Sequence, residues 1–219
     1  SDELPNYENH IFLSLCEVKP GIILAGGYMS GIFLIEKKTG KATFHQQGES
    51  PIRETPDKYI RGIIVDKQGV VWSGGFYSLK GFNPRTAEKQ EYNSPYPITF
   101  LQEKDENSLW VGSIHGLYVF DKKQKRLLPY QGKEEIGCVN AIYHTSDLRK
   151  TYVGTYGNGL FIIDNQTKEI THCVANNSGL LTNNIYSIVP DKNENLFLGT
   201  ENGLSFYKPK DHTFTNWTR

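Results

Sequence analysis

The sequence predicts an all-β fold, a β-propeller built from five four-stranded blades, and three observations support this prediction. First, a glycine that follows a large apolar residue by two positions recurs as Gly26, Gly74, Gly112, Gly154 and Gly199. Second, the steps between these anchor glycines are 48, 38, 42 and 45 residues, a spacing typical of propeller blades. Third, short runs rich in β-branched and aromatic residues alternate with Gly, Asn, Asp and Pro clusters, as an all-β meander requires.

The same order of four strands can be placed on every copy. First strands are expected at residues 11–15, 60–65, 98–101, 139–143 and 185–189. The second strand carries the anchor glycine, and third strands begin near Gly31, Gly81, Gly116, Gly159 and Gly203. Fourth strands are centred 18 residues after each anchor, on Phe44, Tyr92, Tyr130, His172 and Trp217. The sequence therefore predicts one propeller domain over residues 1–219, with blade repeats at about 7–48, 56–94, 96–134, 137–176 and 181–219.

Residues around each anchor glycine are expected to be structural. The bulky residue two positions earlier should fill the space between blades; these residues are Leu24, Trp72, Trp110, Tyr152 and Phe197. The glycine itself should let the chain leave the strand tightly, because it tolerates positive φ and close backbone approach. Asp66, Asp105 and Asp191 follow first strands, where their side chains are expected to form turns by hydrogen bonding to the backbone.

Composition excludes several classes of function. Lys plus Arg and Asp plus Glu both number 24, so the net charge is zero and a nucleic-acid partner is not expected. The apolar runs have the length of strands, so no direct membrane contact by this chain is expected. Three separated cysteines argue against a disulfide framework, and Cys16 is expected to be a small buried apolar residue. No cofactor motif or metal-ligand spacing is present, so no cofactor and no metal site are expected.

Residues 178–188 and 196–204 resemble the two-component regulator propeller repeat. The pattern of that repeat is Ser-Gly-Leu, Asn and Ile, then an acidic turn, Trp-Ile-Gly-Thr and Gly-Leu. Residues 152–160 and 110–117 match its core, whereas Gly27 and Gly75 replace the expected Thr in the first two copies.

The resemblance implies a periplasmic sensor portion of a Bacteroidetes hybrid two-component system, which works in signal transduction and often in carbohydrate sensing. Such receptors are anchored in the inner membrane and carry a histidine kinase elsewhere in the chain. Propellers of this family usually have about seven blades. This chain begins and ends near expected blade boundaries, so we expect an incomplete segment of a larger propeller. A closed five-bladed ring is the alternative.

In a propeller, the loops between second and third strands share one face with the loops between blades, and ligands commonly bind there. Aromatic and histidine side chains in these loops offer apolar faces and hydrogen-bonding tips, which suits sugar rings. An arginine near a first strand adds a charge for acidic sugars. The predicted ligand-binding residues are Tyr28, Arg61, Phe76, Tyr77, His115, Tyr156, Asn158, Glu201 and Asn202. The alternative for these side chains is packing at the hub or over loop ends.

The favoured function is a non-catalytic sensor segment whose partner is an oligosaccharide or glycan fragment. Gly-x-Ser-x-Gly, His-Glu-x-x-His and phosphate-loop motifs are absent from the sequence, so no catalytic residue is predicted. A protein-interaction scaffold is one alternative, in which terminal blades of a partial array would favour a homodimer. A propeller lyase or hydrolase is the other, although only His115 and the nearby acid Glu201 lie on the expected loop face.

Overall fold

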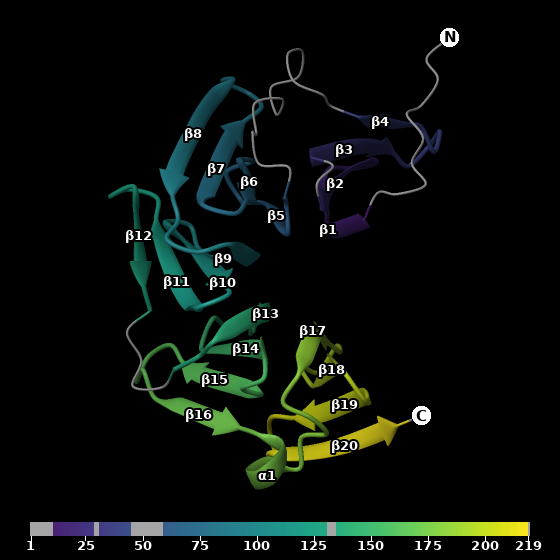
Figure 1. The fold of residues 1–219 in the computed structure, drawn as a ribbon, viewed down its shortest axis with the longest axis vertical. Helices are drawn as coiled ribbons and strands as arrows, with labels where there is room; N and C mark the ends of the chain where they lie inside the picture. The colour runs from purple at the N-terminus through teal and green to yellow at the C-terminus, as the bar shows by residue number, and fades with distance from the viewer. Residues whose placement is uncertain (1–10, 29–30, 45–58, 131–134, 219) are drawn as a thin grey trace. The chain divides into compact units, whose positions relative to one another are not determined.

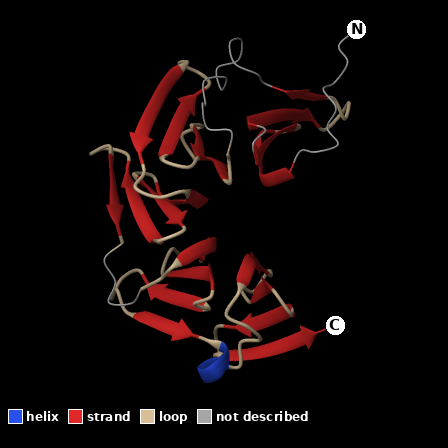
Figure 2. Cartoon of the chain, in the orientation of Figure 1, coloured by secondary structure: helices blue, strands red, loops and turns tan. Residues whose placement is uncertain are grey.

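The computed structural model describes residues 11–28, 31–44, 59–130 and 135–218. Within these residues, twenty strands form five antiparallel four-stranded sheets (Figure 1). Consecutive strands are neighbours in every sheet, so each sheet is a simple meander. The helical structure of this part of the chain is one short turn, α1 (Ala175–Ser178) (Figure 2). The prediction of an all-β propeller fold with four strands in each blade is confirmed.

The strands occur along the chain in groups of four. The first sheet contains β1 (Ile11–Lys19), β2 (Ile22–Tyr28), β3 (Gly31–Glu36) and β4 (Ala42–Phe44). The second contains β5 (Gly62–Val65), β6 (Val71–Gly74), β7 (Ser78–Asn83) and β8 (Glu88–Asn93). The third contains β9 (Ile98–Asp105), β10 (Ser108–Ser113), β11 (Gly116–Asp121) and β12 (Arg126–Pro129).

The fourth sheet contains β13 (Cys138–His144), β14 (Lys150–Tyr156), β15 (Leu160–Asp164) and β16 (Ile170–Cys173). The fifth contains β17 (Ile185–Pro190), β18 (Leu196–Thr200), β19 (Gly203–Lys208) and β20 (Thr213–Thr218). Several of the expected repeats begin or end outside the described residues, namely at 7–10, 45–48, 56–58, 131–134 and 219.

Three expected strand positions are wrong by one to three residues. β7 begins at Ser78, three residues before Gly81. Ile60 and Arg61 precede β5 instead of belonging to it, and Tyr130 follows the last residue of β12. Tyr130 still continues the hydrogen bonding of the sheet, because its N–H donates to the Leu117 carbonyl at 2.8 Å. Its ring also packs against Trp110, with the ring centroids 5.3 Å apart. The recurring position is therefore a packing position even where the strand has ended.

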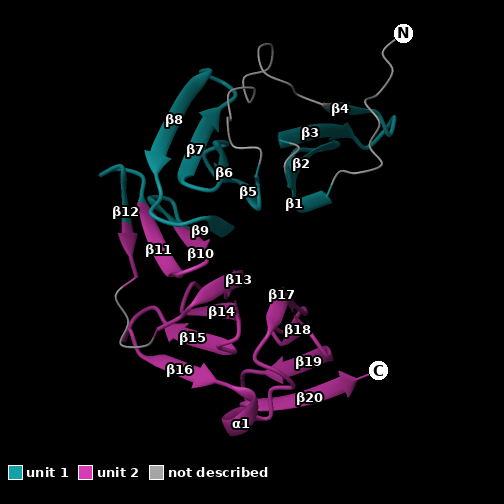
Figure 3. Cartoon of the chain, viewed as in Figure 1, with its two compact units in different colours: residues 1–109, 121–127 teal, residues 110–120, 128–219 magenta. Residues whose placement is uncertain are grey.

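The chain divides into two compact units, which Figure 3 shows in teal and magenta. Unit 1 comprises residues 1–109 and 121–127, and unit 2 comprises residues 110–120 and 128–219. The boundary runs through the third sheet, whereas the other four sheets each belong to one unit.

In unit 1, apolar side chains of the first and second sheets form a common core. Leu24 and Ile32 from the first sheet pack with Ile63 and Val71 from the second, together with Ile60 from the connection between them. All five are buried. A four-stranded sheet cannot bury two apolar faces alone, so this packing between sheets is what supplies the core.

In unit 2, the fourth and fifth sheets are joined in the same way. Tyr152, Leu160 and Ile162 of the fourth sheet pack with Leu198 and Tyr207 of the fifth. The predicted filler residues Leu24, Trp72, Trp110 and Tyr152 are all buried. Phe197 is the exception, being only half-buried.

The anchor glycines are required because a residue at the start of the next sheet packs closely against them, and not because their backbone has a positive φ. A Cβ added at Gly26 would lie 2.6 Å from Cγ2 of Ile60, and one at Gly154 would lie 2.7 Å from Cγ2 of Ile185. Both isoleucines stand at or just before the first strand of the following sheet. Positive φ is found instead at third-strand glycines such as Gly203, with φ 138°. Close approach was expected at the anchors and is confirmed, whereas positive φ was assigned to the wrong glycine of the repeat.

The three turn aspartates behave as the sequence predicts. Oδ1 of Asp66 accepts hydrogen bonds from the N–H of Gln68 and Val70. Oδ1 of Asp105 accepts one from the N–H of Asn107 at 2.9 Å. Oδ1 of Asp191 accepts two in the corresponding turn of the fifth sheet. Each carboxylate therefore satisfies backbone donors that the hairpin leaves unpaired.

Two further expectations concern the cysteines and the apolar runs. Cys16, Cys138 and Cys173 are free thiols, and Cys16 is half-buried where full burial was expected. Cys16 alternates with exposed neighbours on β1, whereas Cys173 is the buried member of the three. Along the described part of the chain, no helix has the length and apolar character needed to cross a membrane.

Candidate functional site

The strongest candidate for a ligand-binding surface is an exposed group of rings in unit 1, formed by Tyr28, Tyr59, Phe76 and Tyr77 and called here the aromatic cluster. Tyr28 ends β2, whereas Phe76 and Tyr77 occupy the loop between β6 and β7. An antiparallel backbone bridge pairs Tyr28 with Tyr59, and the N–H of Ile60 donates to the Gly27 carbonyl at 3.0 Å. The connection between the first two sheets is thereby held against the end of β2.

The rings of the aromatic cluster contact one another in sequence. Tyr28 meets Tyr59 edge to face, with centroids 5.5 Å apart. Tyr59 stacks on Phe76 at 4.4 Å, and Phe76 lies 6.2 Å from Tyr77. These distances fall in the range in which aromatic pairs attract each other. The cluster is nevertheless open to solvent, since Tyr28, Phe76 and Tyr77 are 45%, 39% and 64% exposed.

The backbone holds the loop that carries Phe76 and Tyr77. The N–H of Gly75 donates to the Ser78 carbonyl, and the Tyr77 carbonyl accepts from the N–H of Ser94 at 2.8 Å. Arg61, two residues beyond Tyr59, donates its N–H to the Gly74 carbonyl at 3.4 Å, which places it beside the start of this loop. Its side chain is half-buried. Four of the predicted residues, Tyr28, Arg61, Phe76 and Tyr77, thus belong to one part of unit 1.

A second, polar group lies in unit 2 and centres on Asn184. Oδ1 of Asn184 accepts a hydrogen bond from the N–H of Gly157 at 2.7 Å, and Nδ2 donates to Oε2 of Glu201 at 2.6 Å. The Asn184 carbonyl also accepts from the N–H of Glu201. This residue therefore connects the β14–β15 loop, which follows the 55% exposed Tyr156 at the end of β14, with the β18–β19 turn of Glu201 and Asn202.

Asn158 is hydrogen-bonded to other residues of the protein through both its side chain and its carbonyl. Its Nδ2 donates to the carbonyls of Glu135 and Ile136, at 3.2 and 3.4 Å. Its own carbonyl accepts from Nε2 of His172 at 2.6 Å, while the imidazole stacks on Phe161 with centroids 4.1 Å apart. His172 is thus a packing residue, as expected for its place in the repeat.

His115 is exposed in the β10–β11 turn of unit 2, where its N–H donates to Oγ of Ser113 at 3.1 Å. Among the described residues, no group of three or more His, Cys, Asp or Glu side chains is arranged to hold a metal ion.

Sequence reasoning missed Tyr59 and Asn184. Both lie in connections between blades, just before β5 and β17, whereas the predicted binding residues were taken mainly from loops between second and third strands. A signal was available for each, because Tyr59 directly precedes the buried Ile60, and Asn184 directly precedes the first strand of the fifth blade. Loops between blades share a face with second-to-third-strand loops, so their polar and aromatic residues belong in the same search.

Comparison with known proteins connects this fold to a family. Residues 179–202, which include Asn184 and Glu201, match the model of the two-component regulator propeller family. The expected resemblance is confirmed, and the fifth blade carries a repeat of that family. The comparison with curated proteins gave no match.

Solved structures share the fold at low sequence identity. The extracellular domain of BT3049 from B. thetaiotaomicron, named as a hybrid two-component system, is 17% identical with a TM-score of 0.74, and the match covers 91% of this chain. The extracellular domain of BT4673 from the same organism is named as a hybrid two-component system in one structure and as a one-component system in another. The structure with the hybrid name is 17% identical, with a TM-score of 0.77, and the match covers 100% of this chain. This chain covers only 27% and 29% of those two chains.

Proposed function

We propose that this chain is a non-catalytic, ligand-binding segment of an extracytoplasmic propeller sensor in a two-component system, and that it recognises an oligosaccharide. The aromatic cluster is the observation that carries the proposal. Support for the sensor class comes from the family match at residues 179–202 and from neighbours that are extracellular domains of such systems. The share of those neighbours that this chain covers supports its being part of a longer, many-bladed propeller in the periplasm.

The aromatic cluster suits a sugar for a physical reason. Pyranose rings present apolar C–H faces and a polar rim, so they are bound by flat aromatic faces beside hydrogen-bonding groups. Tyr77 offers the most exposed ring, and Phe76 is held in place by stacking on Tyr59. The rings are fixed by one another and by the backbone bridge at Tyr28, so little side-chain entropy would be lost on binding.

Titration calorimetry of the protein against a panel of neutral oligosaccharides tests the proposal. For an oligosaccharide that binds, Tyr77→Ala should weaken the affinity about threefold to tenfold, the loss expected for one aromatic contact. Tyr28→Ala should have an effect of similar size. Tyr186→Ala is the matched control, because Tyr186 is 49% exposed on β17 of the other unit.

Two outcomes would reject the proposal. If no member of the panel binds, this segment does not act as the oligosaccharide contact. If an oligosaccharide binds but Tyr77→Ala and Tyr28→Ala have no more effect than Tyr186→Ala, the aromatic cluster is not the site.

A further inference from the structure

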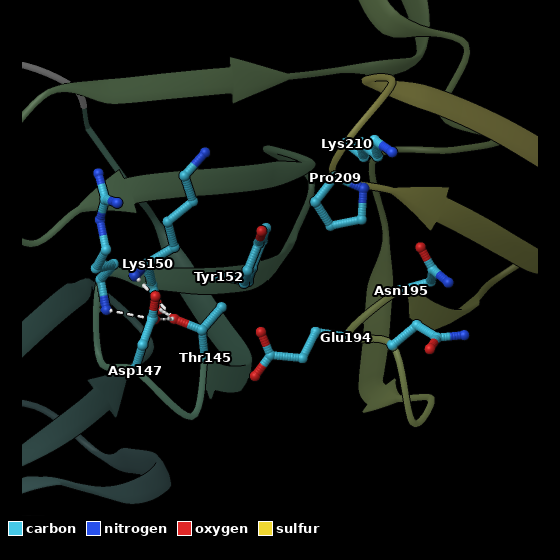
Figure 4. A pocket seen from close by; sticks show the side chains of 10 residues that line it. Thr145, Asp147, Lys150, Tyr152, Glu194, Asn195, Pro209 and Lys210 are labelled. Carbon is cyan, nitrogen blue, oxygen red and sulfur yellow. Dashed lines mark hydrogen bonds between the residues drawn. The ribbon is translucent and has the colours of Figure 1, made fainter.

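A cavity of about 380 Å³ lies between the fourth and fifth sheets of unit 2. Figure 4 shows Tyr152 between Thr145, Asp147 and Lys150 on one side and Glu194, Asn195, Pro209 and Lys210 on the other. These groups come from the β13–β14, β17–β18 and β19–β20 turns and from β14 itself. The alternate turns of the same meanders follow Tyr156 at the end of β14 and contain Glu201 between β18 and β19, so the cavity is at the opposite end of these two sheets.

The two carboxylates in the cavity wall are engaged by the protein itself. Oδ1 of Asp147 accepts hydrogen bonds from Oγ1 of Thr145 and from the N–H of Arg149. These bonds lower the pKa of Asp147. Oε1 of Glu194 accepts from the N–H of Ser146 at 2.7 Å and from the Tyr143 hydroxyl at 3.3 Å. Both acids therefore hold the turns that form the cavity.

The cationic side chains of the cavity, in contrast to its carboxylates, are not paired with other side chains of the described residues. Arg149, Lys150 and Lys210 line it, and none of them forms an ion pair within the described part of the chain. The hydrogen bonds that Oδ1 of Asp164 accepts from the N–H of Thr167 and Gln166 lower the pKa of Asp164, and the nearby Arg149 and Lys150 lower it further. Three cationic side chains thus line the cavity, against two carboxylates that already accept hydrogen bonds from the protein.

The Tyr152 hydroxyl is a further donor at the cavity. Its side chain lines the cavity, and the residue is only 1% exposed. Across the described ranges, its hydroxyl forms no hydrogen bond to another residue, and it keeps access to the cavity instead of being fully enclosed. Burial, with the nearby Tyr207 and Glu194, raises the pKa of Tyr152, so the group stays protonated and can donate at neutral pH.

We propose that this cavity binds a small organic carboxylate that also carries hydroxyl groups. The carboxylate would accept from the side chains of Lys150, Lys210 and Tyr152, for which the described part of the chain provides no acceptor. The volume lies within the roughly 300–1,000 Å³ range of small-molecule sites and exceeds what one inorganic ion fills. Hydroxyl groups on the ligand would meet the polar side chains of Thr145 and Asn193. This site is separate from the aromatic cluster and does not depend on the proposed function.

The probe is gluconate, with sorbitol as its uncharged counterpart of the same chain length. Titration calorimetry should show gluconate binding and no sorbitol binding. Inorganic phosphate and acetate should bind at least about tenfold more weakly than gluconate, since each provides the charge without the hydroxyl groups.

Variants then locate the site. Tyr152→Phe removes one oxygen and keeps the buried ring, and Lys210→Ala changes an exposed turn, so both should fold. Each should weaken gluconate binding about tenfold, as expected for the loss of one hydrogen bond to a charged group. Lys123→Ala makes the same change of charge at an exposed turn outside the cavity and should leave the affinity unchanged. Tyr77→Ala should also have no effect, which separates this result from a failure of the oligosaccharide proposal.

Several results would overturn the inference. Failure of gluconate to bind, or equal binding of sorbitol, would show that the cavity does not select a carboxylate. Equal binding of phosphate or acetate would show that it accepts any anion. Unchanged gluconate affinity in both Tyr152→Phe and Lys210→Ala would place the binding elsewhere.

Discussion

Replacing Lys122 with Met should destabilise unit 1 by breaking a buried ionic network. Nζ of Lys122 lies 2.7 Å from Oδ2 of Asp66 and 3.5 Å from Oε1 of Glu103. The three side chains are 10%, 0% and 14% exposed. Oδ2 of Asp66 also accepts from Nε1 of Trp72 at 2.8 Å. The network therefore joins a turn of the second sheet to residues from the third.

The loss of stability expected for Lys122→Met depends on the hydrogen-bond donors that Asp66 retains. Removing one partner of a buried ion pair costs about 3–5 kcal/mol, because the other charge stays buried without compensation. Asp66 keeps the Trp72 indole and the N–H groups of Gln68 and Val70, so its desolvation remains partly offset. We therefore expect the low end of this range, about 3 kcal/mol. Met preserves most of the apolar stem, so little of the loss comes from packing.

Equilibrium denaturation in urea measures this difference in the free energy of unfolding. Lys104→Met is the matched control, because the Lys104–Asp105 pair has a similar distance, 2.9 Å, but side chains 29% and 39% exposed. That change should cost about 0–1 kcal/mol. The reasoning is refuted if Lys122→Met costs no more than Lys104→Met.

The pH dependence gives an independent check. Burial raises the pKa of Asp66, but the hydrogen bonds from Lys122, Trp72 and Val70 outweigh it, so the pKa lies below its ordinary value. The stabilisation is therefore complete above the unfolded pKa of about 3.9 and is lost as the pH falls through the folded pKa. Lys122→Met removes one of the groups that lower this pKa. The variant should lose less stability than the wild type as the pH is lowered from about 4.

Three further predictions concern packing and loop geometry. Gly154→Ala should destabilise the protein by about 1–3 kcal/mol in urea denaturation, because the added Cβ would lie 2.7 Å from Cγ2 of Ile185; wild-type stability would contradict the close-approach argument. Asn184→Ala should cost about 1 kcal/mol and increase amide hydrogen exchange at Gly157, whose donor loses its acceptor; unchanged exchange there would count against the bridge. Trp72→Ala should cost about 3–5 kcal/mol, and Phe197→Ala less, since Trp72 is 3% exposed and Phe197 half-buried; equal losses would show that the repeat position outweighs burial.

The blade pattern was predictable because it is local. Hydrophobic runs, turn residues and the anchor glycines specify each four-stranded meander within about 40 residues. The turn bonds of Asp66 and Asp191 were predictable for the same reason, since donor and acceptor lie within four residues. The strand ends near Arg61 and Tyr130 were not predictable, because the last hydrogen bonds of a strand depend on the strand beside it.

The candidate site was only partly predictable. Loop composition selected Tyr28, Phe76 and Tyr77, which the structure brings into one cluster. It could not reveal that Tyr59 completes this cluster through a bridge across 31 positions, or that Asn184 connects Gly157 with Glu201.

By itself, the sequence determined the all-β class, the five repeats and four of the five filler residues, because these depend on spacing along the chain. Only the tertiary structure decided which side chains from different blades meet. The repeat marks Tyr152 as a buried filler, yet its hydroxyl opens into a cavity whose other walls come from residues 193–195 and 209–210. Such sites depend on distances between segments about 40–60 positions apart, and a periodic pattern carries no information about those distances.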